Sequence, residues 1–297
     1  MPKPGLVYTH AYFAEIGLHV FPTRKYQLVH ARLVEDGVIA QPDVIEPNAA
    51  AWDELALVHT REYLTKIRDG TLTPDDIAQL ELPWSPEMVE GFRVMVGGTI
   101  EAARLAVDHG GIVGHIGGGL HHAFPNHGEG FCPFNDVAVA IRVLQRDGVQ
   151  RTAVIDLDVH HGNGTAFIFE SDSNVFTFSM HQQYNYPMWK PRGSLDIGLM
   201  DGIGDADYHR QLEEALPAVM ASNPECLFYL AGADPYEQDQ LGGLSLTLDG
   251  LRARDRIVID QARRNRLPMV IVLAGGYARR VEDTVAVHTA TLKEAAR

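Results

Sequence analysis

Asp158 and His160 offer a carboxylate and an imidazole, two residues apart, directly after an apolar β-type run. They lie in the segment AVIDLDVHHGNG, residues 153–164. On an extended chain, residues two apart point to the same face of the strand, so both side chains could bind one metal ion. The pair therefore predicts a metal site at the end of a buried strand.

The elements that would position this pair alternate between strands and helices. Ser85-Pro86 predicts a helix start and Gly110-Gly111 its end, with an apolar face between them. Short β-type runs lie at 112–116, 152–157, 175–178, 226–231 and 269–274, and helical patterns at 135–146, 205–221 and 249–266 separate most of them. Apolar strands joined by helices predict a parallel sheet covered on both faces, with ligand sites at the carboxyl ends of its strands.

Polar residues follow all five runs. In chain order they are the segment 117–136 with the pair His121-His122, then Asp158 and His160, Ser179 to His181, Asp234, and Gly275-Gly276-Tyr277. A single histidine more often satisfies a hydrogen bond than binds a ligand, and a single aspartate at a strand end more often caps a helix. Five such sites at one edge of a sheet instead predict an active site.

Composition narrows the class of protein. The 297 residues, 45% of them hydrophobic, fit one α/β domain over residues 1–297. The net charge of −14 argues against nucleic acid as a partner and suits a cationic substrate, although solubility alone also explains an acidic surface. With only Cys132 and Cys226, a disulfide framework or thiolate zinc site is excluded, so a metal must use histidine and carboxylate ligands. We expect a cytoplasmic protein without membrane attachment, because no signal peptide or long apolar run occurs.

Four segments also resemble a known family. The pair His121-His122, the run AVIDLDVHHGNG, LAGADPYEQDQLGGLSLT at 230–247 and LAGGYAR at 273–279 look like the signature segments of the zinc-dependent histone deacetylases, the acetylpolyamine amidohydrolases and the acetoin-utilisation proteins. The resemblance extends from LVYTHAYF at 6–13 to the last strand and is closest to the class IV branch. It implies the arginase/deacetylase α/β fold, with about eight parallel strands between helices. It also implies hydrolysis of acetyl or longer fatty-acyl groups from the ε-amine of protein lysine by a metal-bound water.

The resemblance assigns a role to each site residue. Asp158, His160 and Asp234 would bind Zn²⁺ and leave positions open for water and substrate, although this hard ligand set also admits Fe²⁺. His122 would be the general base and acid, and His121 would act as a hydrogen-bonding partner. Asn163 would orient His122, and Asp156 would orient His121. The Tyr277 hydroxyl would stabilise the oxyanion. The alternative, that Asp158 and His160 only cap the next helix, is disfavoured by Asp234.

Further positions follow from the same resemblance. An acyl-lysine tunnel would be walled by Gly130, Phe131, Tyr186 and Leu241, although Phe131 and Leu241 could be ordinary core residues. Arg24 matches a position that lines an internal channel in relatives, or is a solvated surface arginine. A structural K⁺ site would use the carbonyls of Asp156, Asp158 and His160 with Ser179 and Met180. Trp84 stands where many protein deacetylases carry a rim aspartate, and it packs on a ligand or staples the next helix.

Three other functions stay open at this point. One is an acetylpolyamine or small-amide deacetylase, which would act on an acylated small amine. A ureohydrolase of the arginase type would need a second-metal carboxylate two residues after His160, where the chain has Gly162. A non-catalytic acyl-lysine or acylpolyamine binding module would keep the pocket without turnover. We expect a monomer, because the long insertions with which polyamine-type relatives dimerise are absent from the sequence.

Overall fold

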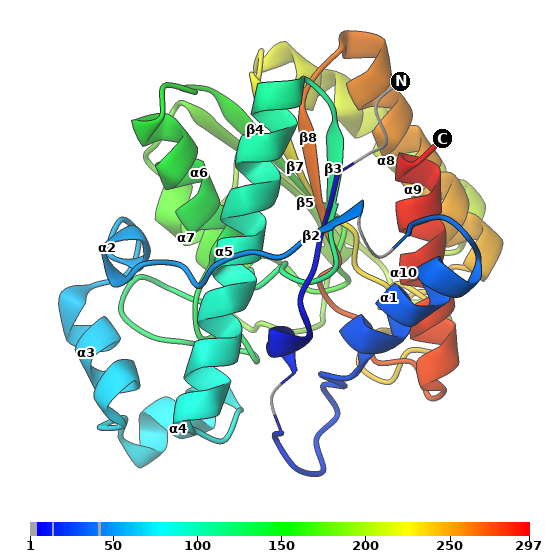
Figure 1. Cartoon of the computed structure of the whole chain (residues 1–297). Helices are drawn as coiled ribbons and strands as arrows, with labels where there is room; N and C mark the ends of the chain where they lie inside the picture. The colour runs from blue at the N-terminus through cyan, green and yellow to red at the C-terminus, as the bar shows by residue number, and fades with distance from the viewer. Residues whose placement is uncertain (1–4, 14, 41–42) are drawn as a thin grey trace.

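The computed structural model of this chain describes residues 5–13, 15–40 and 43–297. A sheet of eight strands runs through it, all parallel, in the order β2-β1-β3-β8-β7-β4-β5-β6 (Figure 1). The strands are β1 (Leu6–Val7), β2 (Val44–Ile45), β3 (Ile112–His115), β4 (Thr152–Asp156), β5 (Val175–Gln182), β6 (Leu195–Leu199), β7 (Cys226–Leu230) and β8 (Met269–Val272). The predicted parallel sheet of about eight strands is confirmed. The sequence patterns missed β1 and β2, which have two residues each, and β6, an edge strand with alternating exposure.

Helices cover both faces of the sheet. The described helices are η1 (His10–Tyr12), α1 (Lys25–Glu35), α2 (Trp52–Leu55), α3 (Arg61–Asp69), α4 (Pro74–Leu80), α5 (Pro86–His109), α6 (Asp136–Arg146), α7 (Asn163–Phe169), α8 (Asp205–Ala221), α9 (Leu248–Asn265) and α10 (Val281–Ala295). Helices α5, α6 and α7 lie on one face, and α1, α8, α9 and α10 lie on the other (Figure 1). None of the described helices combines the length and the apolar character that crossing a membrane requires.

The central strands are buried on both sides because their apolar side chains alternate between two cores. In β4, Val154 packs on the α5–α6 side, whereas Ala153 and Ile155 pack on the α8–α9 side. The strands β7 and β8 alternate in the same way. Their near-continuous apolar runs are therefore the pattern expected of a parallel sheet between two helical layers.

The long helix α5 begins and ends where the sequence predicted. The Ser85 hydroxyl accepts a hydrogen bond from the Met88 N–H, and Gly110 ends the helix with φ of 62°. Trp84, just before the cap, donates from Nε1 to the Ile67 carbonyl at 2.7 Å. This tryptophan therefore ties the start of α5 to α3, which agrees with a packing role rather than a ligand contact.

The parallel order brings the five predicted strand ends together. Strands β3, β8, β7, β4 and β5 are consecutive neighbours in the sheet, so the segments that follow them meet at one edge. This edge is at the bottom of Figure 1. Any chemistry carried by these segments is therefore concentrated in one place.

Candidate metal centre and active site

Three ligand side chains converge at the ends of β4 and β7. Asp158, His160 and Asp234 each offer an atom within 4.8 Å of those of the other two, and all three side chains are buried. The other oxygens of the two carboxylates are held by backbone donors. Gly275 N–H donates to Asp158 Oδ2 at 2.8 Å, and Val159 N–H donates to Asp234 Oδ1 at 2.8 Å. The remaining atoms, Asp158 Oδ1, His160 Nδ1 and Asp234 Oδ2, therefore lie close together.

The donor set fits a metal ion. Asp234 Oδ2 is buried without a hydrogen-bond partner, and a buried acceptor of this kind normally signals an ion or water. Burial and the negative charge of Asp158 raise the pKa of Asp234 above its usual range, and a cation bound between the two carboxylates would offset both effects. Gly275 is required here, because a Cβ would lie 1.9 Å from Asp234 Oδ2.

The geometry that joins Asp158 to His160 differs from the one expected. Strand β4 ends at Asp156, so both residues lie in a bend beyond the strand, and strand alternation does not align them. Instead, Asp158 Oδ1 accepts the His160 N–H at 2.9 Å and lies 3.0 Å from His160 Nδ1. A local turn closed by the aspartate side chain therefore brings the two ligand atoms together.

A buried arginine holds the backbone just before Asp158 and just before Asp234. Arg254 of α9 is fully buried and pairs with Asp255, its Nε and Nη2 lying 2.9 and 2.8 Å from Asp255 Oδ1. Its Nη1 donates to the carbonyls of Gly232 and Leu157 at 2.6 and 3.3 Å. These carbonyls precede Asp234 and Asp158 by two residues and one residue. Sequence reasoning missed Arg254, because its segment LRARDR resembles the polar face of a surface helix.

The histidine pair lies beside the three ligands, and each ring is fixed from behind. His121 Nδ1 lies 2.7 Å from Asp156 Oδ2, and His122 Nδ1 lies 2.7 Å from Asn163 Oδ1. These are the two pairings that the family resemblance implied. The two Nε2 atoms face each other at 3.1 Å, so one of them must carry a proton and the other must accept it.

The electrostatic environment assigns that proton. Burial opposes protonation of His121, but the charges of Asp156 and Asp158 outweigh it and raise the pKa of His121 to about 9. Burial, followed by the charge of His121, lowers the pKa of His122 well below its usual value. His121 is therefore the cationic donor, and His122 is the neutral ring that can accept a proton.

The turn that presents the histidine pair is held by the first residues of α6. Asp136 accepts the N–H groups of Gly119 and Leu120 at 3.0 and 2.7 Å. Asn135 caps α6 and donates from Nδ2 to the His121 carbonyl at 3.4 Å. Because both residues are fully buried, the backbone around the histidines has little freedom to move.

Tyr277 approaches the ligands from the end of β8. Its ring centroid lies 6.4 Å from that of His160, and its N–H donates to Asp239 Oδ2 at 2.7 Å. Asp239 Oδ1 accepts the N–H of Leu241 at 2.8 Å, so this aspartate joins two loops of the site. Burial and the charges of Asp158 and Asp234 raise the pKa of Tyr277 well above its usual value. The phenol therefore stays protonated and can donate a hydrogen bond.

The cavity above the ligands is narrow. Its volume is about 20 Å³, and its walls include the predicted residues Gly130 and Phe131, together with Phe21 and Tyr277. Gly130 and Phe131 have φ of 52° and 67°, and such strain in a non-glycine residue is typical of functional sites. Tyr186 lies at the edge, its ring 5.0 Å from that of His122. Leu241 is partly buried against the core and is not among the residues that line this cavity, so its role as a tunnel wall stays a prediction.

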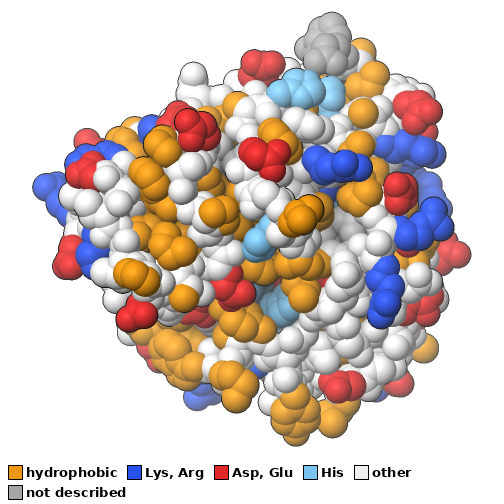
Figure 2. All heavy atoms as spheres, turned by 90° about the horizontal axis from the view of Figure 1, so that it is seen from below, with side chains coloured by type: hydrophobic (Ala, Val, Ile, Leu, Met, Phe, Trp, Pro, Cys, Tyr) orange, Lys and Arg blue, Asp and Glu red, His pale blue; other side chains and the backbone are white. Residues whose placement is uncertain are grey.

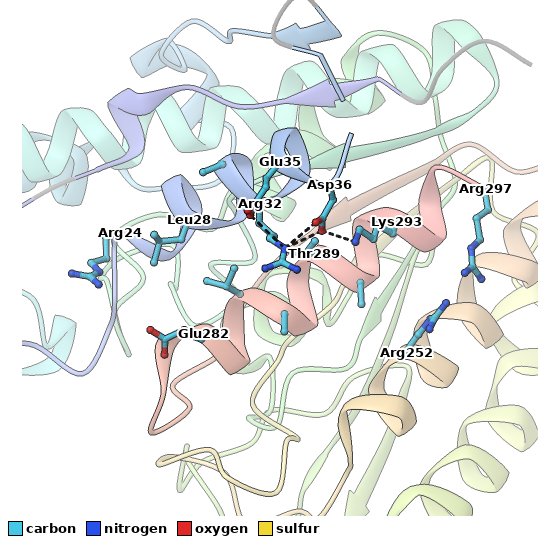
Figure 3. Close-up of a pocket in the computed structure, with 14 residues that line it drawn as sticks. Arg24, Leu28, Arg32, Glu35, Asp36, Arg252, Glu282, Thr289, Lys293 and Arg297 are labelled. Atoms are coloured by element: carbon cyan, nitrogen blue, oxygen red, sulfur yellow. Dashed lines mark hydrogen bonds and ion pairs between the residues drawn. The ribbon is translucent and has the colours of Figure 1, made fainter. Parts of the chain in front are cut away.

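The buried cation near the site is Lys25, whereas Arg24 is the surface arginine that the sequence left as an alternative to a channel-lining residue. Lys25 is fully buried, its Nζ donates to the Ala274 carbonyl at 2.7 Å, and it lies 5.7 Å from the centroid of the Tyr277 ring. Burial lowers the pKa of Lys25 to about 8, although Asp234 and Asp158 oppose this. Arg24 is exposed and lines a different groove of about 940 Å³ between α1 and α10 (Figure 3). Arg24 and Lys25 are consecutive residues at the start of α1, and only the second one points inward.

The groove in Figure 3 lacks the groups that the chemistry needs. Asp36, at the end of α1, pairs with Arg32 of the same helix at 3.0 Å and with Lys293 of α10, on the other wall, at 2.6 Å. Its floor consists of small and aliphatic side chains such as Ala286 and Val285. Although it is the more spacious of the two cavities, it carries none of the histidines or ligand carboxylates.

Hydrophobic side chains, mixed with polar and charged ones, surround the narrow cavity. Seen from the side on which the strands end, histidine side chains show at the centre among hydrophobic ones (Figure 2). Exposed hydrophobic side chains on the segments next to the cavity walls are Leu18, Tyr184, Met188 and Trp189. Their neighbours His19 and Tyr186 contact Phe131 and His122 respectively. The entrance therefore offers apolar contact to whatever carries the reacting group.

The site has no room for a second metal ligand after His160. A Cβ on Gly162 would lie 2.4 Å from Asp156 Oδ2, the atom that binds His121. A carboxylate at this position would therefore displace the pair that fixes His121. This geometry argues against the two-manganese ureohydrolase alternative.

Comparisons with known proteins agree with this geometry. The histone deacetylase domain profile matches residues 19–292. The chain is 43% identical to an uncharacterized protein of Picosynechococcus sp. over 91% of both sequences, and 32% identical to histone deacetylase 2 of Arabidopsis thaliana over 96% of this chain and 78% of that protein. It is 30% identical to the acetoin utilization protein AcuC of Staphylococcus aureus over 78% of this chain. The crystal structure of the HDA15 HD domain matches the fold with a TM-score of 0.82 and 24% identity, covering 97% of this chain and 90% of that one.

Proposed function

The chain belongs to the histone deacetylase family, and from this premise we propose that it removes acyl groups from the ε-amine of lysine in proteins or peptides by metal-dependent hydrolysis. Family membership by itself supports a hydrolase that acts on amides. The observation that carries the proposal is the meeting of three elements around one cavity: the ligands Asp158, His160 and Asp234, the proton-accepting His122, and the Tyr277 hydroxyl. Together they offer a cation site, a base and an oxyanion donor for amide hydrolysis.

We infer that the ion is Zn²⁺, with Fe²⁺ as the alternative. Two carboxylates and one imidazole leave coordination positions open, and this ligand set suits either ion. When bound, such an ion lowers the pKa of a water molecule and polarises the acyl carbonyl. A structural K⁺ is proposed at the predicted carbonyl site, which is supported by the pairing of Asp156 with Ser179 in adjacent strands.

The protein's own groups carry the proton transfers. The neutral His122 can take the proton from the attacking water through Nε2 and later return it to the departing amine. His121, held as a cation by Asp156, stabilises negative charge that develops beside it. Tyr277 keeps its proton and can donate a hydrogen bond to the oxyanion, an interaction that is strongest in the transition state.

The dimensions of the cavity favour a short acyl group. A volume of about 20 Å³ holds roughly one water molecule, so an acetyl group needs less rearrangement of Phe21 and Phe131 than a fatty-acyl chain does. The apolar rim suits the methylene stem and the neighbouring residues of an acylated peptide.

A second candidate is deacetylation of a small polyamine. It is favoured by Trp84, which packs against α3 and offers no carboxylate to clamp a peptide backbone. The net charge of −14 would also attract a cationic amine. A non-catalytic binding module would retain the same pocket but show no turnover.

The test is release of free amine from a panel of acetyl-lysine peptides, long-chain acyl-lysine peptides and acetylpolyamines, with the protein loaded with Zn²⁺ or Fe²⁺. Asp158→Ala protein is the blank, and Asp108→Ala, which changes an exposed aspartate of α5, is the matched control. We expect release from acetyl-lysine peptides by the wild-type and control proteins only. Release from polyamines alone would support the second candidate. No release by protein with bound metal would reject deacylation of these three substrate classes.

A further inference from the structure

Behind the histidine pair lies a carboxylate to which the family resemblance assigned no role. Glu129 Oε1 accepts a hydrogen bond from Asn163 Nδ2 at 2.6 Å. The other end of the same amide, Asn163 Oδ1, lies 2.7 Å from His122 Nδ1. Glu129, Asn163 and His122 are therefore linked by consecutive hydrogen bonds that end at the cavity.

Glu129 determines which group donates and which accepts in each of these hydrogen bonds. A carboxylate only accepts hydrogen bonds, whereas an amide has one donor end and one acceptor end. If the Asn163 amide were turned over, its oxygen would face the carboxylate of Glu129 at 2.6 Å, and two acceptors would repel each other. Glu129 thus forces the amide oxygen toward His122, and this oxygen can only accept a proton from Nδ1. His122 then keeps its lone pair on Nε2, the atom on the side of His121.

We propose that Glu129 is a positioning residue that fixes the amide of Asn163 and, through it, the Nδ1–H tautomer of His122 required of the catalytic base. The role in catalysis rests on the proposed function, whereas the tautomer does not. Asn163 alone could not specify the tautomer, because an amide free to turn over serves either form of the ring.

The carboxylate of Glu129 is itself held in place. Its Oε2 is shared by Gln79 Nε2 at 3.1 Å and His127 Nε2 at 3.2 Å, Oε1 accepts from Asn163, and Tyr186 also interacts with this carboxylate. Burial opposes ionisation, but hydrogen bonds from His127, Asn163 and Gln79 lower the pKa of Glu129 below its usual value. The backbone of Glu129 exchanges two hydrogen bonds with Cys132, at 3.1 and 2.9 Å, across the turn that carries Phe131. Glu129 is therefore a charged, oriented group on the same turn as the cavity wall.

The first test compares steady-state kinetics on the best substrate of the panel. Glu129→Ala should lower kcat about 10- to 100-fold, the usual effect of removing a group that orients a catalytic histidine, with KM within about twofold. Glu129→Gln keeps an oxygen for Asn163 and should lose only about fivefold, since a charged hydrogen bond becomes a neutral one. The matched control is Glu62→Gln, because Glu62 is exposed on α3 and should leave both constants unchanged.

A double variant that moves the negative charge from position 129 to position 163 should rescue activity. Asn163→Asp alone would place two carboxylates in contact and should be less active than the wild type. The double variant Glu129→Gln, Asn163→Asp should recover kcat relative to Asn163→Asp, because the introduced glutamine donates to the introduced aspartate, which accepts from His122 Nδ1. A merely structural role for Glu129 predicts no such recovery.

The second test needs no activity. In protein labelled with ¹⁵N histidine, the two ring nitrogen shifts of His122 should report an Nδ1–H tautomer in the wild type and in Glu129→Gln. They should report a mixture of tautomers in Glu129→Ala. An unchanged tautomer in Glu129→Ala would overturn the proposal, as would a kcat within twofold of the wild type in an active enzyme. If the wild type releases no amine from any substrate, the proposed function fails while the tautomer measurement still decides this inference.

Discussion

Replacing the buried Arg254 by methionine should both destabilise the protein and weaken metal binding, although Arg254 touches no metal ligand side chain. The side chain is fully buried, and its removal leaves Asp255 as a buried carboxylate with only the hydroxyls of Tyr229 and Thr291 as donors. Breaking a buried ion pair by removing one partner costs about 3–5 kcal/mol. With an unfolding entropy of about 2.1 cal/mol/K per residue over 297 residues, a loss of about 4 kcal/mol lowers Tm by about 6 °C.

The effect on metal binding has a separate cause. Without Arg254, the carbonyls of Gly232 and Leu157 lose the donor that holds the backbone just before Asp234 and Asp158. Loss of such a supporting contact weakens metal affinity by about 10- to 100-fold. Calorimetry of the metal-free protein measures the first effect, and competition with a chromogenic chelator measures the second.

Two further variants separate these effects. The double variant Arg254→Met, Asp255→Leu removes the unpaired charge, so it should regain part of the lost stability while its metal affinity stays low. Arg252→Met is the matched control, because Arg252 is exposed and its partner Glu294 keeps Arg256 and Arg297. An Arg254→Met protein with a Tm within about 1 °C of the wild type and unchanged metal affinity would refute the reasoning.

Three other outcomes can be checked directly. Tyr277→Phe should retain bound metal, measured by elemental analysis, and lose about 10²-fold or more in kcat; full activity would remove this hydroxyl from the mechanism. Lys25 has its pKa lowered from 10.5 to about 8, so in metal-free protein the unfolded state holds this proton at higher pH than the folded state. Relative to Lys25→Met, denaturant titrations should therefore show stability rising by about 3 kcal/mol between pH 8 and 10.5, and parallel pH curves would contradict the burial argument. Phe131→Ala should raise kcat/KM for long acyl chains relative to acetyl, and an unchanged ratio would show that Phe131 does not limit chain length.

The central strands and their polar ends could be predicted from sequence because their signals are local. Apolar runs bounded by glycine and polar residues mark buried strands, and a ligand residue just after a strand is visible in the same window. The weak strands β1 and β2 carry no such signal, since two residues are too few for a period. The alternation of strands and helices predicted that the strand ends meet at one edge, but the convergence of Asp158 with Asp234 also needs β4 beside β7, an order that the sequence patterns did not specify.

The groups that support the site could not be predicted, because their role depends on contacts distant in sequence. Arg252, Arg254 and Arg256 alternate along one helix, yet only Arg254 is buried. Lys25 and Arg24 differ by one position, and one step in a helix rotates a side chain by about 100°, which separates the cavity from the surface. Glu129 reaches Asn163 across 34 residues and sits in a glycine-rich turn whose sequence suggests only a loop.

The charge balance of the interior explains why these support residues occur together. Four of the buried carboxylates, Asp156, Asp158, Asp234 and Asp239, lie near the cavity, and the buried cations beside them in the described part of the chain are Lys25 and His121. Arg254 adds no net charge, since it is neutralised by Asp255. Isolated buried charges are costly, so this excess of negative charge is tolerable only with a further cation in the same place. A divalent ion at the proposed site of Asp158 and Asp234 would supply it, so metal binding would stabilise the fold as well as serve the proposed chemistry.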